Sequence, residues 1–332
     1  MIFDIILGLS VFLISLLGTR LTILALRKRT VLMDVPNLRS NHKAPTPRGG
    51  GIAVVMAIVI GLLLADIHYS IVLAIFLLAA VSLLDDLISV PPWVRLLVQA
   101  MAVGLPLSLR HAPIFSDALP LWLDRGMAAL LWIWFINLFN FMDGIDGISA
   151  SEMICIGMGF CLLAVFSDAF SHNLFSYSLI VATAGFGFLW WNWHPARIFL
   201  GDVGSVPIGF IIGYLLLMAS TSGYLFPALI LPAYYLADGT LTLLRRLCER
   251  KKIWVAHSEH YYQRAVRAGR RHDRVTLYIF GVNLLLILLA VFSALHPHIA
   301  VICLAMAYLA VFMLLGFFAH DRTGLSHDSA AL

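Results

Sequence analysis

The sequence predicts an all-α polytopic membrane protein, and three observations support this fold class. Hydrophobic residues make up 61% of the chain and charged residues 12%, and the mean hydropathy of +0.93 lies far above that of a soluble domain. Long apolar runs recur from end to end, and the charged clusters fall mainly in every second connection between them. We expect about 11 transmembrane helices in one domain over residues 1–320, with a short cytoplasmic tail over residues 321–332.

Each helix is predicted from an apolar run, since a bilayer core of about 30 Å needs roughly 20 apolar residues per helix. The first run is about 24 residues long and has no basic segment before it, which predicts a retained helix rather than a cleaved signal peptide. Several runs are shorter than the bilayer requires, so their ends are approximate. The runs comprise residues 3–26, 50–66, 71–84, 94–109, 126–141, 150–166, 174–191, 205–220, 224–244, 275–295 and 298–318.

The positive charges predict the orientation of these helices, because Lys and Arg are retained on the cytoplasmic side. With the N-terminus outside and the C-terminus inside, the inner connections hold 19 of the 22 Lys and Arg residues. The pI of 8.9 therefore arises from local basic loops, and we expect no nucleic-acid partner.

The first inner loop, residues 34–51, combines prolines, basic side chains and three successive glycines. Lys43 and Arg48 are donors suited to phosphate, and the glycines lead into the second helix, where free N–H groups favour an anion. A plain positive-inside loop with a glycine helix entry is the competing interpretation.

Two adjacent carboxylates, Asp85 and Asp86, follow the third apolar run. They oppose each other and the dipole of the helix that they end. A divalent cation, a shared proton or a nearby positively charged side chain such as Arg95 would stabilise them.

The fifth run ends in N-L-F-N-F-M-D-G-I-D-G, which places Asn140, Asp143 and Asp146 three residues apart. A helix would present all three on one face. In a loop, the glycines would instead let the backbone approach a ligand closely.

A further motif, W-W-N-W-H-P-A-R-I-F-L-G-D-V-G-S, precedes the eighth run. Asp202 is suited to an N-cap, but Asn192 and Phe199 nearby form an amide and aromatic pair that can recognise a nucleobase.

The largest inner loop carries His257, His260 and Arg264, whose spacing predicts one helical face. Zinc needs more ligands than these, so we expect a surface for pyrophosphate or sugar. The inner loops together hold carboxylates and an amide for a hard cation, cations for phosphates, and a base-binding pair. This set predicts phosphoryl transfer from a nucleotide-activated donor to a lipid acceptor.

The motifs resemble those of the polyprenyl-phosphate N-acetylhexosamine-1-phosphate transferases, a family that includes the initiators of O-antigen and the phospho-MurNAc-pentapeptide translocase. The matching elements are P-N-x-R-S-x-H-x-x-P-T-P-R-G-G-G, D-D, N-F-M-D-G-I-D-G, F-L-G-D-x-G-S and an H-x-x-H loop, in order along the chain. The resemblance implies Mg²⁺, with Mn²⁺ as a substitute, and transfer of a sugar 1-phosphate from a UDP-N-acetylhexosamine donor to undecaprenyl phosphate with release of UMP. It also implies a multi-pass protein of the bacterial inner membrane with its site facing the cytoplasm; a homodimer stays open.

The resemblance also assigns roles to individual residues. It implies Asp202 and Asn140 as Mg²⁺ ligands, and Asp85, with Asp86 as its partner, at the lipid phosphate. It places Lys43 at the diphosphate or nucleotide, and the uridine at Asp143, Asp146, Asn192 and Phe199. It places the pyrophosphate and sugar at His257, His260 and Arg264. We expect Asp85, Asp86, Asp143 and Asp202 to be the catalytic residues, and the basic side chains Arg48 and Arg95 to bind substrate as well.

Two departures from the family pattern bear on the substrate. H-S-E-H replaces the triple histidine of the MurNAc-pentapeptide enzyme, and it also differs from the H-I-H-H form of the common-antigen enzyme. Together with P-N-x-R-S-x-H, this loop looks closest to that of the O-antigen initiators of the Pseudomonas type, in lipopolysaccharide synthesis. UDP-GlcNAc, UDP-N-acetylfucosamine and UDP-N-acetylquinovosamine stay open as donors. A phospho-MurNAc-pentapeptide transferase and a membrane transporter, the latter suggested by Asp238 within a predicted span, are the alternative functions.

Overall fold

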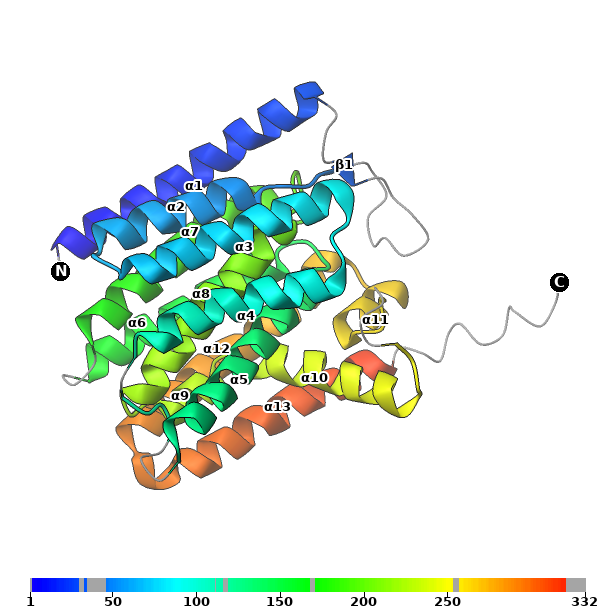
Figure 1. Ribbon diagram of the computed structural model, residues 1–332. Coiled ribbons are helices and arrows are strands. Elements are labelled where there is room, and N and C mark those ends of the chain that lie inside the picture. Colours follow the sequence, from blue (N-terminus) through cyan, green and yellow to red (C-terminus); the bar gives the residue numbers. More distant parts are fainter. Residues whose placement is uncertain are drawn as a thin grey trace.

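The computed structural model describes residues 2–29, 33–34, 46–110, 112–115, 119–167, 171–252 and 257–320, and these are almost entirely helical (Figure 1). Two short strands, β1 (Met33–Asp34) and β2 (Thr46–Pro47), pair antiparallel with Met33 opposite Pro47. The helices are α1 (Ile2–Arg29), α2 (Gly51–Leu64), α3 (Tyr69–Ile88), α4 (Pro92–Ser108), α5 (Leu121–Met142), α6 (Ile148–Phe166), α7 (His172–Asn192), α8 (Asp202–Thr221), α9 (Leu225–Ile230), α10 (Ala233–Cys248), α11 (Tyr261–Arg267), α12 (His272–Leu295) and α13 (Ala300–His320), with a 3₁₀ turn η1 (Pro297–Ile299) before α13.

Each of the predicted apolar runs coincides with helix, which supports a polytopic membrane protein. Within the described residues, 8 helices are long and apolar enough to cross a membrane. Helix α2, with 14 residues, and α4, with 17, are shorter. The ninth run, residues 224–244, is interrupted at Leu231 and Pro232 between α9 and α10, where the proline cannot donate a helical hydrogen bond. The number of crossings and the orientation stay predictions.

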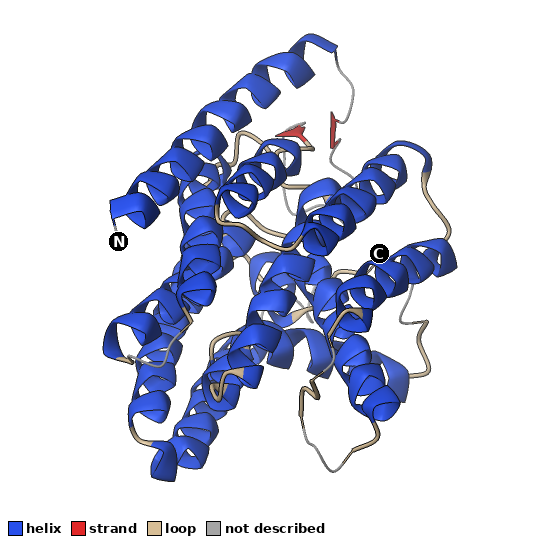
Figure 2. Ribbon diagram, turned by 60° about the vertical axis from the view of Figure 1, so that its left-hand side comes forward, coloured by secondary structure: helices blue, strands red, loops and turns tan. Residues whose placement is uncertain are grey.

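Helix α8 lies at the centre of the bundle and packs against α2, α3 and α5. On one side α7 packs against both α1 and α6, and on the other α12 packs against both α6 and α13 (Figure 1). Figure 2 shows that helices make up nearly all of the described structure. Most residues of α6 and α8 are buried, whereas α1 exposes large apolar side chains such as Leu9 and Leu17. This distribution suits central helices enclosed by protein and outer helices in contact with lipid.

The start of α2 lies in direct backbone contact with the start of α8. A Cβ atom at Gly51 would overlap the backbone of Gly204, so the glycine permits this approach. The N–H groups of Gly49 and Gly50 donate to the Phe199 carbonyl at 3.2 and 2.9 Å, and that of Gly51 donates to the Leu200 carbonyl at 2.9 Å. The predicted anion site on these glycines is therefore wrong, because the α7–α8 loop uses their N–H groups.

Candidate active site

Arg48 joins two acids that are 116 residues apart in the sequence. Its Nη2 lies 2.6 Å from Asp202 Oδ1, and its Nε lies 3.4 Å from Asp86 Oδ1. Local backbone pairing fixes this geometry, since the Phe199 N–H donates to the Pro47 carbonyl at 2.8 Å. The second Asp86 oxygen accepts the Val203 N–H at 3.3 Å, so Asp86 also holds the start of α8. The Asp202 side chain does not cap its helix; it faces Arg48 instead.

Asp143 ends α5 and is held by the following helix. Its Oδ1 accepts the Ser149 hydroxyl at 2.7 Å. Burial, together with the negative charges of Asp202 and Asp86, raises the pKa of Asp143 to about 6, although Ser149 and Arg48 oppose the shift. Asp143 therefore belongs electrostatically to the same cluster as Arg48, Asp86 and Asp202. We call these four residues the carboxylate cluster.

Asp85 does not share the partners of Asp86; it forms an ion pair with Arg95, as the sequence predicted. Arg95 Nη1 lies 2.8 Å from Asp85 Oδ2, and the other oxygen accepts the Val90 N–H at 2.7 Å. A cavity of about 380 Å³ begins at this pair and extends along apolar side chains of α3, α4 and α5. Its polar lining consists of Ser82, Asp85, Arg95, Gln99, Asn137, Asn140 and Asp202.

Oxygen donors at the polar end of this cavity fit a hard divalent cation. Asp202 and Asn140 both line it, and the Asn140 amide donates to the Ser205 hydroxyl at 2.7 Å. Arg48 is the cation that ion-pairs with Asp86 and Asp202 among the described residues, and Asp143 adds a third negative charge. The donor set and this excess of negative charge therefore suit Mg²⁺ at the predicted ligands.

Asp146 lies in a different environment from Asp143. It contacts His194 Nδ1 at 2.6 Å and His272 Nδ1 at 3.2 Å, and accepts the Ala196 N–H at 3.1 Å. Burial would raise the pKa of Asp146, but these partners outweigh it and hold the pKa below its usual value. The ligand atoms of Asp146, His194 and His272 lie within 4.8 Å of one another and can hold a metal ion, the one such group of three among the described residues. Its nitrogen donors suit a softer metal than magnesium.

The amide of Asn192 connects two loops. Its oxygen accepts the Gly147 N–H and its nitrogen donates to the Ile198 carbonyl, both at 2.9 Å. The sequence left a helix or a loop open for this segment, and the structure has a loop between α5 and α6. Within this loop, Asp143 and Asp146 face different partners. The uridine contacts of Asp146, Asn192 and Phe199 stay predictions.

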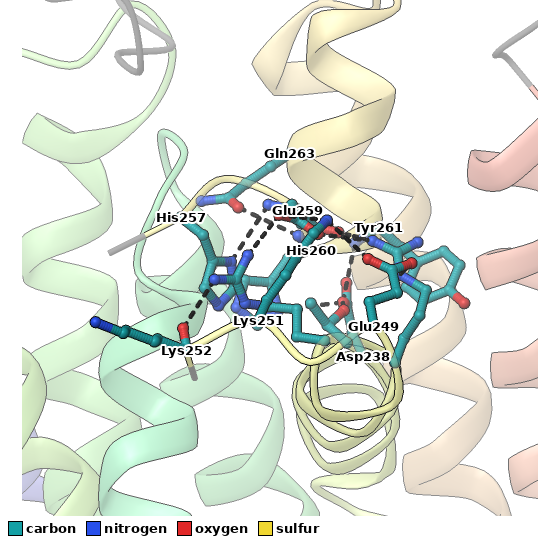
Figure 3. A network of polar contacts seen from close by, with 12 residues as sticks. Asp238, Glu249, Lys251, Lys252, His257, Glu259, His260, Tyr261 and Gln263 are labelled. Atoms are coloured by element: carbon teal, nitrogen blue, oxygen red, sulfur yellow. Dashed lines mark hydrogen bonds and ion pairs between the residues drawn. The ribbon is translucent and has the colours of Figure 1, made fainter. Parts of the chain in front are cut away.

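The histidine loop, residues 257–260, lies where α10 meets α11 (Figure 3). The rings of His257 and His260 stack with centroids 5.0 Å apart. Burial and the neighbouring His260 lower the pKa of His257 to about 4. Because α11 begins only at Tyr261, the prediction that His257 shares a helical face with His260 and Arg264 is wrong. Between these two histidines in the sequence lies Glu259, which forms ion pairs with Arg245, Arg246 and Lys251.

The structure thus brings together most of the predicted residues at the end of the bundle where α3, α5 and α10 finish. Lys43 lies outside the described residues. Sequence reasoning missed His194 and His272, although the first stands inside a motif that we singled out. It also gave no positioning role to Asp238, which lies beneath the histidine loop (Figure 3).

Comparison with known proteins gives one matching family and many relatives. The profile of glycosyl transferase family 4 matches residues 68–220. The probable undecaprenyl-phosphate N-acetylglucosaminyl 1-phosphate transferase of Bacillus subtilis is 28% identical over 293 residues, covering 82% of this chain and 81% of that protein. The decaprenyl-phosphate N-acetylglucosaminephosphotransferase of Mycolicibacterium smegmatis is 28% identical and covers 82% of this chain and 78% of that protein. A phospho-N-acetylmuramoyl-pentapeptide-transferase of Desulforapulum autotrophicum is 30% identical over 52% of this chain and 58% of its own length.

Proposed function

We propose that the chain, whose residues 68–220 match the profile of glycosyl transferase family 4, transfers an N-acetylhexosamine 1-phosphate group from a UDP-sugar to undecaprenyl phosphate and releases UMP. The relatives named for polyprenyl-phosphate substrates match 82% of the chain, which supports a polyprenyl phosphate acceptor.

The observation that carries this proposal is the cavity with apolar walls and a charged end. A polyprenyl phosphate has the same division, an apolar chain and an anionic head. Leu78, Val81 and Leu130 offer an apolar wall, while Arg95 offers a positive charge beside Asp85. Because the cavity also reaches Asn140 and Asp202, a phosphate head held there lies beside the predicted Mg²⁺ ligands.

Each group of residues at the cavity has a separate role in the proposed reaction. Arg95 binds the acceptor phosphate, and Asp85 orients Arg95 and takes up any proton that this phosphate carries. When bound at Asp202 and Asn140, Mg²⁺ would neutralise negative charge on the diphosphate of the donor. Arg48 contributes a further positive charge at the same acids. The histidine loop contacts the pyrophosphate and sugar of the donor.

The chemical step breaks and forms one bond to phosphorus. An oxygen of the lipid phosphate attacks the β-phosphorus of the UDP-sugar in line with the bond to the α-phosphate oxygen, which leaves with UMP. The sugar C–O bond stays intact, so the anomeric configuration is retained. A two-step route through a phosphorylated aspartate, with Asp85 or Asp143 as candidate nucleophile, predicts the same products.

We further propose that the reaction initiates a lipid-linked glycan of the O-antigen type at the cytoplasmic face of the inner membrane. The basic inner connections support this orientation. A phospho-MurNAc-pentapeptide transferase is the second candidate, and the relative from Desulforapulum autotrophicum favours it. That match covers 52% of this chain, against 82% for the GlcNAc-phosphate transferases.

The test is an assay of the purified full-length protein with undecaprenyl phosphate, Mg²⁺ and a panel of UDP-N-acetylhexosamines, including UDP-MurNAc-pentapeptide. We expect equimolar UMP and an undecaprenyl diphosphate carrying one N-acetylhexosamine, identified by mass. Release of UDP with a monophosphate lipid, or no product from any donor, would contradict the proposed reaction. A product from UDP-MurNAc-pentapeptide alone would replace it with the second candidate.

A further inference from the structure

We propose that Asp238 is the positioning residue of the histidine loop, which it holds in place through His260 and the first residues of α11. This inference rests on the proposed function, because it assigns the loop to the donor. Asp238 lies in α10 and its side chain is fully buried. A charge in such a place is costly unless its surroundings supply hydrogen bonds.

The carboxylate of Asp238 accepts four hydrogen bonds from described residues. It accepts the N–H groups of Tyr261 at 2.9 Å and Tyr262 at 3.2 Å, at the start of α11. From its own helix it accepts the hydroxyls of Tyr234 at 3.1 Å and Thr242 at 3.2 Å. These four bonds fix the first turn of α11 onto α10.

His260 is the partner that connects Asp238 to the loop. Its ring packs beside the carboxylate, with Nδ1 3.4 Å from Asp238 Oδ1 but no hydrogen bond between these two atoms, and its side chain is 2% exposed. The ring of His260 stacks between those of His257, at 5.0 Å, and Tyr262, at 5.9 Å. Figure 3 shows His257 and His260 side by side above Asp238. A shift of His260 would therefore move His257, the more exposed of the pair.

The same helix start also contacts the end of α5. The Tyr262 hydroxyl donates to the Phe141 carbonyl at 3.0 Å, one residue after Asn140. A Cβ atom at Gly144 would overlap the Tyr262 hydroxyl, so the α5–α6 loop packs tightly on α11. Asp238 thus sets the position of the histidine loop relative to the predicted metal ligand Asn140.

Asp124 provides a matched control at the other end of α5. It is also fully buried and accepts two backbone N–H groups, from Ile114 at 2.6 Å and Phe115 at 2.8 Å. Asp124 stabilises its own loop far from the carboxylate cluster. Loss of charge at Asp124 therefore reports the general cost of such a change to a buried acid.

The experiment compares Asp238→Asn with Asp124→Asn in the purified full-length protein. We expect Asp238→Asn to raise the KM for the UDP-sugar at least about 10-fold, because a displaced donor contact weakens binding and alignment. The KM for undecaprenyl phosphate should stay within about twofold. Hydrogen exchange at Tyr261 and Tyr262 should become faster, while the centre of α6 stays protected. Asp124→Asn should lower the melting temperature and leave both KM values unchanged.

A double-mutant cycle with His260→Gln separates positioning from general stability. If Asp238 acts through His260, the double variant will be no worse than the poorer single variant. Additive losses, or a normal KM for the UDP-sugar in Asp238→Asn, would overturn the proposal. If Asp238→Asn does not fold, Tyr234→Phe removes one donor to the carboxylate and must raise the same KM to a smaller degree; an unchanged KM there would also overturn it. Failure of the wild-type protein to release UMP would instead count against the proposed function.

Discussion

Two acidic regions at one end of the bundle differ in how their negative charge is compensated. In the carboxylate cluster, Asp86 and Asp202 contact one guanidinium, that of Arg48, and Asp143 feels the charges of all three. Around Asp238, a single carboxylate meets four hydrogen-bond donors and the ring of His260. Among the described residues, the first region has three carboxylates and one guanidinium, whereas the carboxylate of Asp238 is satisfied by hydrogen bonds from the protein itself.

This difference separates acids that can bind a ligand from acids that support the structure. Carboxylates that share too few cations repel one another, and a bound divalent ion would relieve that repulsion. A buried acid with a full set of donors has little capacity left for substrate, so it serves by fixing what surrounds it. Replacing an acid by its amide should therefore remove catalysis in the cluster and only displace a loop at Asp238.

The largest expected effect follows substitution of Asp202. Asp202→Asn should lower the rate of Mg²⁺-dependent UMP release by about 10³-fold or more, since it removes the charge of the proposed Mg²⁺ ligand and the partner of Arg48. Asp273 is the matched control, because it is also an acid in the first turn of a helix. Asp273→Asn should keep near-normal turnover. Equal activity of the two variants would remove the distinction between the cluster and an ordinary helix start.

Asp85 offers an intermediate case, since Arg95 compensates its charge one to one. Asp85→Asn should lower kcat by about 10²-fold, because the variant loses the carboxylate that pairs with Arg95 and that we propose as the proton acceptor. Binding of the UDP-sugar, measured by calorimetry, should stay within about twofold of wild type. Full turnover at neutral pH would show that a compensated acid on the cavity wall contributes nothing to the reaction.

The contact between α2 and α8 tests whether the cluster depends on its scaffold. Gly51→Ala introduces an overlap with Gly204 and should separate the two helices, which displaces Arg48 from Asp202 and lowers kcat by about 10-fold. Gly104→Ala is the matched control, because a Cβ atom there meets nothing within 4 Å. If both alanine variants are equally active, the cluster tolerates movement of α2.

The sequence predicts the helical elements well and the pairing of side chains incompletely. Apolar runs locate the helices because lipid imposes length and composition on them. The partner of Asp85 could be foreseen, since Arg95 lies close along the chain. That Arg48 meets Asp202 could not, because the contact depends on how β2 aligns with Phe199.

The misjudged residues share one physical cause. Periodicity placed His257 on a helix, but the carboxylate of Asp238 binds the N–H groups of Tyr261 and Tyr262 and makes the helix begin later. Likewise, Asp146 contacts His194 and His272, which lie 48 and 126 residues further along the chain, and does not share the environment of Asp143. Contacts of such long range leave no periodic signal in the chain.

The smallest effect, a change of melting temperature with pH, tests the excess charge directly. The pKa of Asp143 is raised from 3.8 to about 6, so its contribution to folding is present below pH 3.8 and is lost as the pH rises through 6. In EDTA, lowering the pH from 7.5 to 5 should therefore raise the melting temperature of wild type relative to Asp143→Asn by about 2–4 °C. The two proteins are compared at each pH, because His257, with its pKa lowered to about 4, destabilises both of them as the pH falls from 6.5 to 4.

Added Mg²⁺ at pH 7.5 should stabilise wild type more than the variant, because the ion relieves the same repulsion. Identical pH dependence in the two proteins would mean that Asp143 does not interact with the charges of Asp86 and Asp202, and that the cluster consists of Arg48, Asp86 and Asp202 alone.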